Sequence, residues 1–237
     1  MVGLELNDPF RYVKAVVTEK EPMSTLAKVP PPRRASIGAR RNPESAAAVL
    51  SAARELLVEK GYAGFSVDEV ARRAGAGKPT IYRWWPTKAD LFITIYGAEK
   101  TAAIAVPDRG CLADDLVDYT VALWRFWRSN PAGGAFRGLI AEAQASQAAL
   151  TALREKFLPE RLEPLRTIFS RGVARNEVKA IEIEDRIALW VGFNWFRLLT
   201  GQIDEDGQAI ARAMKAIVGP PLEQGSTQKG RPDSPPR

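Results

Sequence analysis

Apolar residues recur every three or four positions along most of the chain between residues 43 and 218. This is the spacing of amphipathic helices, and we find no convincing strand pattern beside it. The sequence therefore predicts an all-α fold. Short helices are expected over residues 43–60, 66–74, 78–85 and 87–100, and longer ones over 111–129, 133–147, 150–175, 183–201 and 205–218.

Prolines and glycines punctuate this helical pattern. Gly61 ends the first run, and Pro86 ends the short helix that starts near residue 78. Pro159 and Pro164 fall inside the segment 150–175. Because proline donates no amide hydrogen and its ring collides with the preceding turn, we expect a kink or a break there.

Two short motifs have the form of helix starts. Ser66 and Glu69 are spaced as a capping box, in which the serine oxygen accepts from the Glu69 amide and the Glu69 carboxylate accepts from the serine amide. The segment 87–90 caps another helix in the same region. Between them, Gly75-Ala76-Gly77 interrupts the helix, and Pro79 suits the first turn of the next helix.

The order helix, glycine-containing turn and short helix over residues 66–86 is the layout of a helix-turn-helix. Ile81 and Trp85 are four residues apart and are expected to pack inward against the preceding helix. Lys78 and Tyr82 share another face, beside Thr80, Arg83 and Trp84. Such a surface can donate to phosphate oxygens and reach base edges in a major groove. Residues 87 and 88 open the next helix, whose free amides and partial positive charge offer a second phosphate site.

The composition excludes several classes of chemistry. The 237 residues contain no histidine and a single cysteine, Cys111. These counts remove Ser-His-Asp and Cys-His catalysis, histidine-ligated metals and cysteine-rich zinc sites. We therefore expect no enzyme activity, no metal and no cofactor. A chain without an intramolecular disulfide suggests the cytoplasm, and neither a signal peptide nor a membrane span is expected.

Positive charge is concentrated in one part of the chain. Residues 33–100 hold twelve basic and seven acidic groups, whereas residues 101–237 hold eighteen and seventeen. This distribution is typical of a polyanion-binding module on a nearly neutral body, although ordinary surface charge explains it equally well. Residues 1–40 are expected to form a flexible basic arm, with Met23 as an alternative start. Four arginines at the end of the arm and directly after it either follow the minor groove or stay solvated: Arg33, Arg34, Arg40 and Arg41.

The segment from Phe65 to Leu91 resembles the DNA-binding signature of TetR/AcrR transcriptional regulators. The resemblance rests on Val70-Ala71, Ala74-Gly75, Thr80-Ile81-Tyr82, Trp85 and Pro86-Thr87-Lys88. Two positions depart from the commonest pattern: Gly77 stands where serine or threonine is usual, and Pro79 where glycine is usual. Losing the hydroxyl at residue 77 removes one potential cap or phosphate contact.

The resemblance implies a role for individual residues. Ser66, Tyr82, Thr87 and Lys88 would contact phosphates, and Thr80 would support the approach of the backbone. The residues that contact base edges would come from the short helix. Trp84 in this helix either packs in the core or contacts DNA. The implied DNA-binding set is Ser66, Lys78, Pro79, Thr80, Tyr82, Arg83, Trp84, Thr87 and Lys88.

The resemblance further implies that residues 41–101 form the DNA-binding domain and that residues 102–218 form a helical domain for homodimerisation and effector binding. The helix 183–201 is apolar around most of its circumference, so one face is expected to meet a partner subunit. The candidate interface comprises Trp190, Phe193, Phe196, Ile210, Met214 and Ile217. Large aromatic residues either fill the core or line an effector pocket: Trp124, Trp127, Phe136, Phe157 and Phe169.

The sequence thus predicts a regulator, more plausibly a repressor than an activator. It would bind palindromic double-stranded operator DNA as a homodimer and be released by an unknown small molecule. The alternative is a helix-turn-helix regulator whose body binds a protein partner. Residues 219–237, with five prolines, are expected to form a disordered tail.

Overall fold

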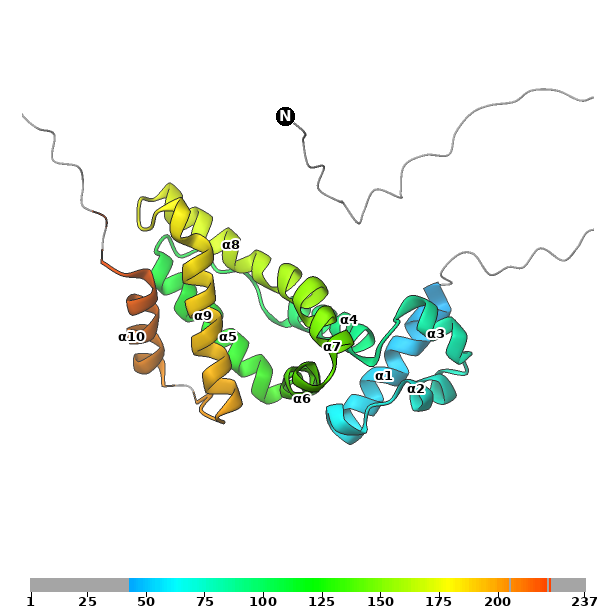
Figure 1. Ribbon diagram of the computed structural model, residues 1–237. Helices are drawn as coiled ribbons and strands as arrows, with labels where there is room; N and C mark the ends of the chain where they lie inside the picture. Colours follow the sequence, from blue (N-terminus) through cyan, green and yellow to red (C-terminus); the bar gives the residue numbers. More distant parts are fainter. Residues whose placement is uncertain (1–42, 205, 221, 223–237) are drawn as a thin grey trace, which may run out of the picture. The chain divides into compact units, whose positions relative to one another are not determined.

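The structure is a computed structural model that describes residues 43–204, 206–220 and 222. Every regular element in these residues is helical, as the apolar spacing predicts (Figure 1). The expected arm over residues 1–40 lies outside the described residues, as does the expected tail apart from residues 219, 220 and 222.

Four helices form the first part of the fold: α1 (Pro43–Gly64), α2 (Val67–Ala74), α3 (Lys78–Trp84) and α4 (Lys88–Ala103). Gly61 has non-helical backbone angles (φ 59°, ψ −171°), so the first helical run of α1 ends there as predicted, and one further turn follows across this kink before Phe65. The glycine permits this left-handed conformation because it has no β-carbon. The result is that Tyr62 is buried, at 6% exposure.

The body begins with α5 (Leu112–Ser129) and α6 (Pro131–Ala145). Asn130 separates them, and its side chain accepts hydrogen bonds from the amides of Ala132 and Gly133 at the start of α6. Helix α6 packs on both α5 and α1, so it connects the body to the first part of the fold.

The expected helix 150–175 is irregular, which confirms the prediction from its prolines. It is divided into α7 (Gln147–Ala152), a π-helical turn η1 (Leu153–Phe157) and α8 (Leu158–Ala174). The π-helical turn ends two residues before Pro159, whose ring nitrogen cannot donate an α-helical hydrogen bond, while Pro164 lies within α8.

The last elements are a 3₁₀ turn η2 (Ala180–Glu182), α9 (Ile183–Leu199) and α10 (Gly207–Val218). Helix α9 packs on α8 and α10, and α10 packs mainly on α5. No helix in the described part of the chain is long and apolar enough to cross a membrane.

Candidate nucleic-acid interface

A left-handed glycine forms the bend between α2 and α3. Gly75 ends α2 with φ 61° and ψ 24°, and its amide donates to the carbonyl of Ala71. Gly77 then precedes α3 without a side-chain cap, as expected from the missing hydroxyl, and Pro79 occupies the first turn. The inward face is as predicted: Ile81 is fully buried and Trp85 is 3% exposed.

The outward face of this unit carries most of the predicted DNA-binding residues. Thr80, Trp84, Thr87 and Lys88 are half-buried, and the other five are exposed: Ser66, Lys78, Pro79, Tyr82 and Arg83. The Tyr82 ring is 46% exposed, which is unusual for an aromatic residue next to a buried core. The surface thus presents a phenol, an ammonium and a guanidinium together, all of which donate hydrogen bonds.

Polar contacts already hold some of these side chains. The Lys78 amine lies 2.7 Å from a carboxylate oxygen of Asp68, and both side chains are more than half exposed. The Arg83 guanidinium lies 6.0 Å from the centre of the Trp84 ring. Trp84 is half-buried: part of its side chain packs against the core, and the rest stays exposed.

The cap at the start of α4 forms in both directions. The Thr87 hydroxyl accepts from the Asp90 amide at 3.0 Å, and the Asp90 carboxylate accepts from the Thr87 amide at 3.0 Å. The hydroxyl also donates to that carboxylate at 2.9 Å, so the hydroxyl proton of Thr87 is used inside the cap. Lys156, in η1, pairs with the same carboxylate at 2.7 Å.

Lys88 is held by the body as well as by α4. Its amine lies 4.2 Å from the centre of the Tyr62 ring and 3.5 Å from a carboxylate oxygen of Glu142 in α6. Gly138, one turn before Glu142, lies against the same tyrosine. A residue that was expected only at the DNA surface therefore also contacts the body.

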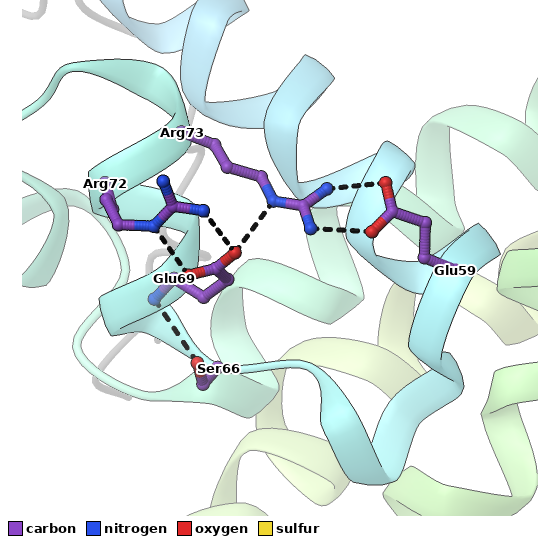
Figure 2. Close-up of polar contacts among 5 residues, drawn as sticks. All are labelled: Glu59, Ser66, Glu69, Arg72 and Arg73. Carbon is purple, nitrogen blue, oxygen red and sulfur yellow. Dashed lines mark hydrogen bonds and ion pairs between the residues drawn. The ribbon is translucent and has the colours of Figure 1, made fainter.

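The capping box predicted at the start of α2 is wrong in its second half. The Ser66 side chain accepts from the Glu69 amide at 3.3 Å, as expected. The Glu69 carboxylate, however, accepts from Arg72 and Arg73 instead of the Ser66 amide, and Arg73 also forms two hydrogen bonds with Glu59 in α1 (Figure 2). Hydrogen bonds from Arg72, and next from Arg73, lower the pKa of Glu69 to about 2.

Three of the five aromatic residues expected at an effector pocket line a small cavity. A cavity of about 30 Å³ lies among α4, α5, α8 and α9, and Trp127, Phe136 and Phe157 line it. Trp124 and Phe169 are buried in the core but are not among the residues that line this cavity, and the Trp124 indole nitrogen donates to Asn194. Spacing along the sequence did not reveal the other wall residues, among them Tyr96, Lys100, Arg161 and Trp195.

The predicted dimer interface needs a correction. Trp190, Ile210, Met214 and Ile217 are at most 7% exposed in the single chain, so their own subunit already buries them. The reason is that α10 turns its single apolar face onto α5. Phe193 is half-buried, and Phe196 is 60% exposed. Leu189 and Leu199, which were not singled out, are 60% and 50% exposed on the same helix.

Comparisons with known protein families agree with this layout. Residues 49–95 match the profile of the bacterial regulatory proteins of the tetR family, and residues 106–217 match that of the tetracyclin repressor-like C-terminal domain. The first match contains α2, α3 and the start of α4.

Individual proteins support the same assignment over most of the chain. The uncharacterised HTH-type transcriptional regulator YdeS of Bacillus subtilis is 33% identical over 174 residues, covering 73% of this chain and 87% of YdeS. The DNA-binding transcriptional repressor TetR of Mycobacteroides abscessus is 33% identical over 138 residues, covering 58% of this chain and 72% of the repressor. The crystal structure of the TetR family regulator SCO0332 has a TM-score of 0.63 and 25% identity, covering 74% of this chain and 97% of that one.

Proposed function

The chain belongs to the TetR family of transcriptional regulators, and from this premise we propose that it is a repressor that binds palindromic operator DNA as a homodimer and is released by a small-molecule effector. The observation that carries the proposal is the exposed face of α3, supported from behind by the buried Ile81 and Trp85. Repression is favoured over activation because the M. abscessus relative is named a repressor.

The proposed contacts are of two kinds: contacts with phosphates, which position the protein on the DNA, and contacts with base edges, which recognise the sequence. Tyr82 and Lys88 bind phosphates, and these contacts carry no sequence information. Lys78 and Arg83 reach base edges in the major groove, where a guanidinium pairs with guanine. The cap uses the amides of Thr87 and Asp90, so the further phosphate site that we propose at the start of α4 consists of the amides of Lys88 and Ala89 between them.

Helix α9 supplies the proposed dimer contact. One face packs inside the subunit through Ile187, Trp190 and Leu198. The other face exposes Leu189, Phe196 and Leu199, which are spaced seven and three residues apart and therefore share a stripe. The α9 helix of a partner subunit would cover this stripe. The two helix-turn-helix units of the dimer, about 34 Å apart, would then meet successive major grooves of the DNA.

Helix α4 connects the proposed effector cavity to the DNA surface. Lys88 lies in its first turn, whereas Tyr96 and Lys100 line the cavity. The separation of eight to twelve residues corresponds to roughly 12–18 Å along the helix. Helix α6 makes a parallel connection, because Phe136 lines the cavity and Glu142 pairs with Lys88. An effector that widens the cavity would shift both helices and thereby reposition Lys88.

Operator binding tests the proposal. Footprinting on the DNA that flanks the gene would give a symmetric protected site. Tyr82→Phe is expected to weaken binding to all sequences at an unchanged salt slope, since it removes one neutral donor. Lys88→Gln is expected to weaken binding and to reduce the slope of log K against log salt by about 0.9. Lys215→Gln on α10 is the control. Unchanged affinity in both test variants would refute the phosphate assignment.

The dimer contact is tested separately. Phe196→Glu is expected to give a monomer in sedimentation with poor operator affinity. Val58→Glu is the matched control, because Val58 is also an exposed apolar residue, at 66%, but lies on α1. A Phe196→Glu protein that remains dimeric at micromolar concentration would refute the α9 interface.

A further inference from the structure

A lysine is buried at the end of the cavity without a carboxylate partner. Lys100 is 7% exposed, and its amine lies 2.7 Å from the Tyr119 hydroxyl and 3.4 Å from the backbone carbonyl of Arg161. Within the part of the chain that the structure describes, it forms no ion pair with an acid. A buried ammonium is costly unless an opposite charge accompanies it.

A second cation lies beside it. The side chain of Arg161 is 14% exposed, and its guanidinium fits against the backbone of α4 because residue 97 is glycine: a β-carbon there would be 2.4 Å from the Arg161 Nη2. Nη2 pairs with the exposed Glu160, but the buried Nε has no hydrogen-bond partner among the described residues. One donor of the guanidinium fork is therefore left without an acceptor.

Arg161 separates two spaces of different character. On one side is the small cavity, whose other walls are mostly apolar and include Leu123, Trp127, Phe136 and Phe157. On the other side is an open groove of about 840 Å³ along α4, η1 and the start of α8, which Arg161 also lines. A ligand from solvent would thus reach the two cations through the groove, and its body would meet the aromatic walls beyond them.

We propose that Lys100 and Arg161 bind the carboxylate of an organic monoacid whose compact hydrocarbon or aromatic body enters the cavity. The proposal rests on the effector-release function above and names the chemical class of that effector. A carboxylate offers two oxygens, one for the free Nε of Arg161 and one for the Lys100 amine. Charge-assisted hydrogen bonds of this kind are the strongest that side chains make.

The charge of the site fits a monoanion better than a dianion. Glu160 already neutralises part of the Arg161 charge. Burial, and next the charge of Arg161, lower the pKa of Lys100 to about 7, so this amine is only partly protonated at neutral pH. The site as a whole therefore has roughly one positive charge to satisfy.

The size of the cavity implies that the ligand moves its walls. A volume of about 30 Å³ corresponds to the space of one water molecule, so even a small acid must displace side chains. The wall residues Phe136, Phe157 and Trp195 lie on α6, η1 and α9. The π-helical turn η1 is the least regular of these elements, and Lys156 beside Phe157 holds Asp90 at the start of α4. Binding at this site would therefore act on the elements that position Lys88.

The proposed binding is linked to protons. The groups that face the Lys100 amine are Tyr119 from α5 and Arg161 from α8, with Tyr96 on its own helix, and burial raises the pKa of both tyrosines. These phenols stay neutral, so Lys100 is the group that titrates near neutral pH. A bound carboxylate raises the pKa of Lys100, and binding then takes up a proton above pH 7. Affinity is expected to fall about tenfold per pH unit there.

The experiment compares acids with their amides on the full-length protein. Benzoate, phenylacetate and hexanoate are tested against benzamide, phenylacetamide and hexanamide, by thermal stabilisation and by titration calorimetry. The expected result is that at least one acid binds ten times or more tightly than its amide, and that Lys100→Met abolishes the preference and its pH dependence. Lys179→Met, at an exposed lysine, is the control and should keep both.

Lys100→Met should fold, because an apolar side chain of similar length replaces a buried unpaired cation. If it does not, Arg161→Met provides the second variant with the same expected loss. Equal binding of acids and amides, binding of no acid at millimolar concentration, or an acid preference that survives in the folded variant would each overturn the proposal. Operator binding by the wild-type protein is measured in parallel: its absence refutes the proposed function, whereas its presence without acid binding refutes only the effector class.

Discussion

Two glycines of α6 provide a sharp test of how closely this helix packs on α1. A β-carbon at Gly138 would lie 2.6 Å from the Tyr62 β-carbon and 2.7 Å from its γ-carbon, which real β-carbons essentially never do. A β-carbon at Gly134 would meet nothing closer than 3.7 Å. Tyr62 cannot easily move away, because it is 6% exposed and its ring stacks edge-on against Phe92 at 5.0 Å.

The two alanine variants are therefore expected to differ in stability, with Gly138→Ala the less stable of the two. Replacing glycine by alanine inside a helix stabilises by about 1 kcal/mol. Gly134→Ala should gain this amount, whereas Gly138→Ala gains it and loses about 1–3 kcal/mol to overpacking. Since both variants share the helical gain, the difference between them isolates the steric cost. For a domain of this size it corresponds to a separation of about 2–12 °C in Tm.

The assay is thermal unfolding at one fixed protein concentration, because a dimer melts at a temperature that depends on concentration. Gly134→Ala should melt above the wild type, and Gly138→Ala below Gly134→Ala. Operator affinity provides a second measurement, since Lys88 lies on the Tyr62 ring and should move with it. If Gly138→Ala melted as high as Gly134→Ala, the close contact between α1 and α6 would not exist.

Further changes test single features of the helix-turn-helix. Gly75→Ala places a β-carbon on a left-handed residue and should cost about 1–2 kcal/mol, measured by chemical unfolding; an unchanged midpoint would argue against the bend. Arg83→Ala should relax sequence preference at one operator position in a binding-site selection, and retained selectivity would remove Arg83 from the residues that contact base edges. The Glu69 ion pairs should stabilise the protein fully above about pH 4.5 and be lost as the pH falls toward 2, because the folded-state pKa is depressed. Glu69→Gln should therefore make the stability of the protein depend less on pH in this range. A variant whose stability falls with pH as that of the wild type does would contradict the pairing.

The helix-turn-helix could be predicted because its signals are local. The bend needs a residue at positive φ, and Gly75 supplies it. The helix start at Thr87 is fixed by one hydroxyl and one carboxylate three residues apart, and both halves of that cap form. The same reasoning failed at Glu69, because two arginines within one turn compete for its carboxylate. Local spacing identifies possible partners, but it does not rank them.

The proposed dimer face could not be predicted from periodicity, because the spacing of apolar residues does not reveal which element covers them. Met214 has the spacing of an interface residue, yet it lies fully buried on α5 with its sulfur 3.6 Å from the Thr120 hydroxyl. The indole nitrogen of Trp190 donates to the same hydroxyl. Only the three-dimensional arrangement reveals that α9 retains a second apolar stripe after α10 has been placed.

The buried cations were missed for a related reason. Lys100 and Arg161 are charged residues on helices, and such residues usually lie in solvent. They are 61 positions apart in sequence and meet only because Gly97 lets α8 approach α4. The clue in the sequence was slight: Lys100 follows Tyr96 by four residues, so it lies on the buried face of a helix whose other contacts are apolar.

Helix α4 has a buried ionisable group near each end, and the two groups differ in their partners. Asp90 near its start is 7% exposed and is held by Thr87 and by Lys156, while Lys100 near its end is equally buried and pairs with no acid among the described residues. The first end is electrostatically satisfied and the second is not. A rigid helix transmits a change at the unsatisfied end to the satisfied one, because its length is fixed by backbone hydrogen bonds. An anion at Lys100 would therefore change the free energy of the cap at Thr87, and with it the orientation of Lys88 toward DNA, without any contact between the ligand and the helix-turn-helix.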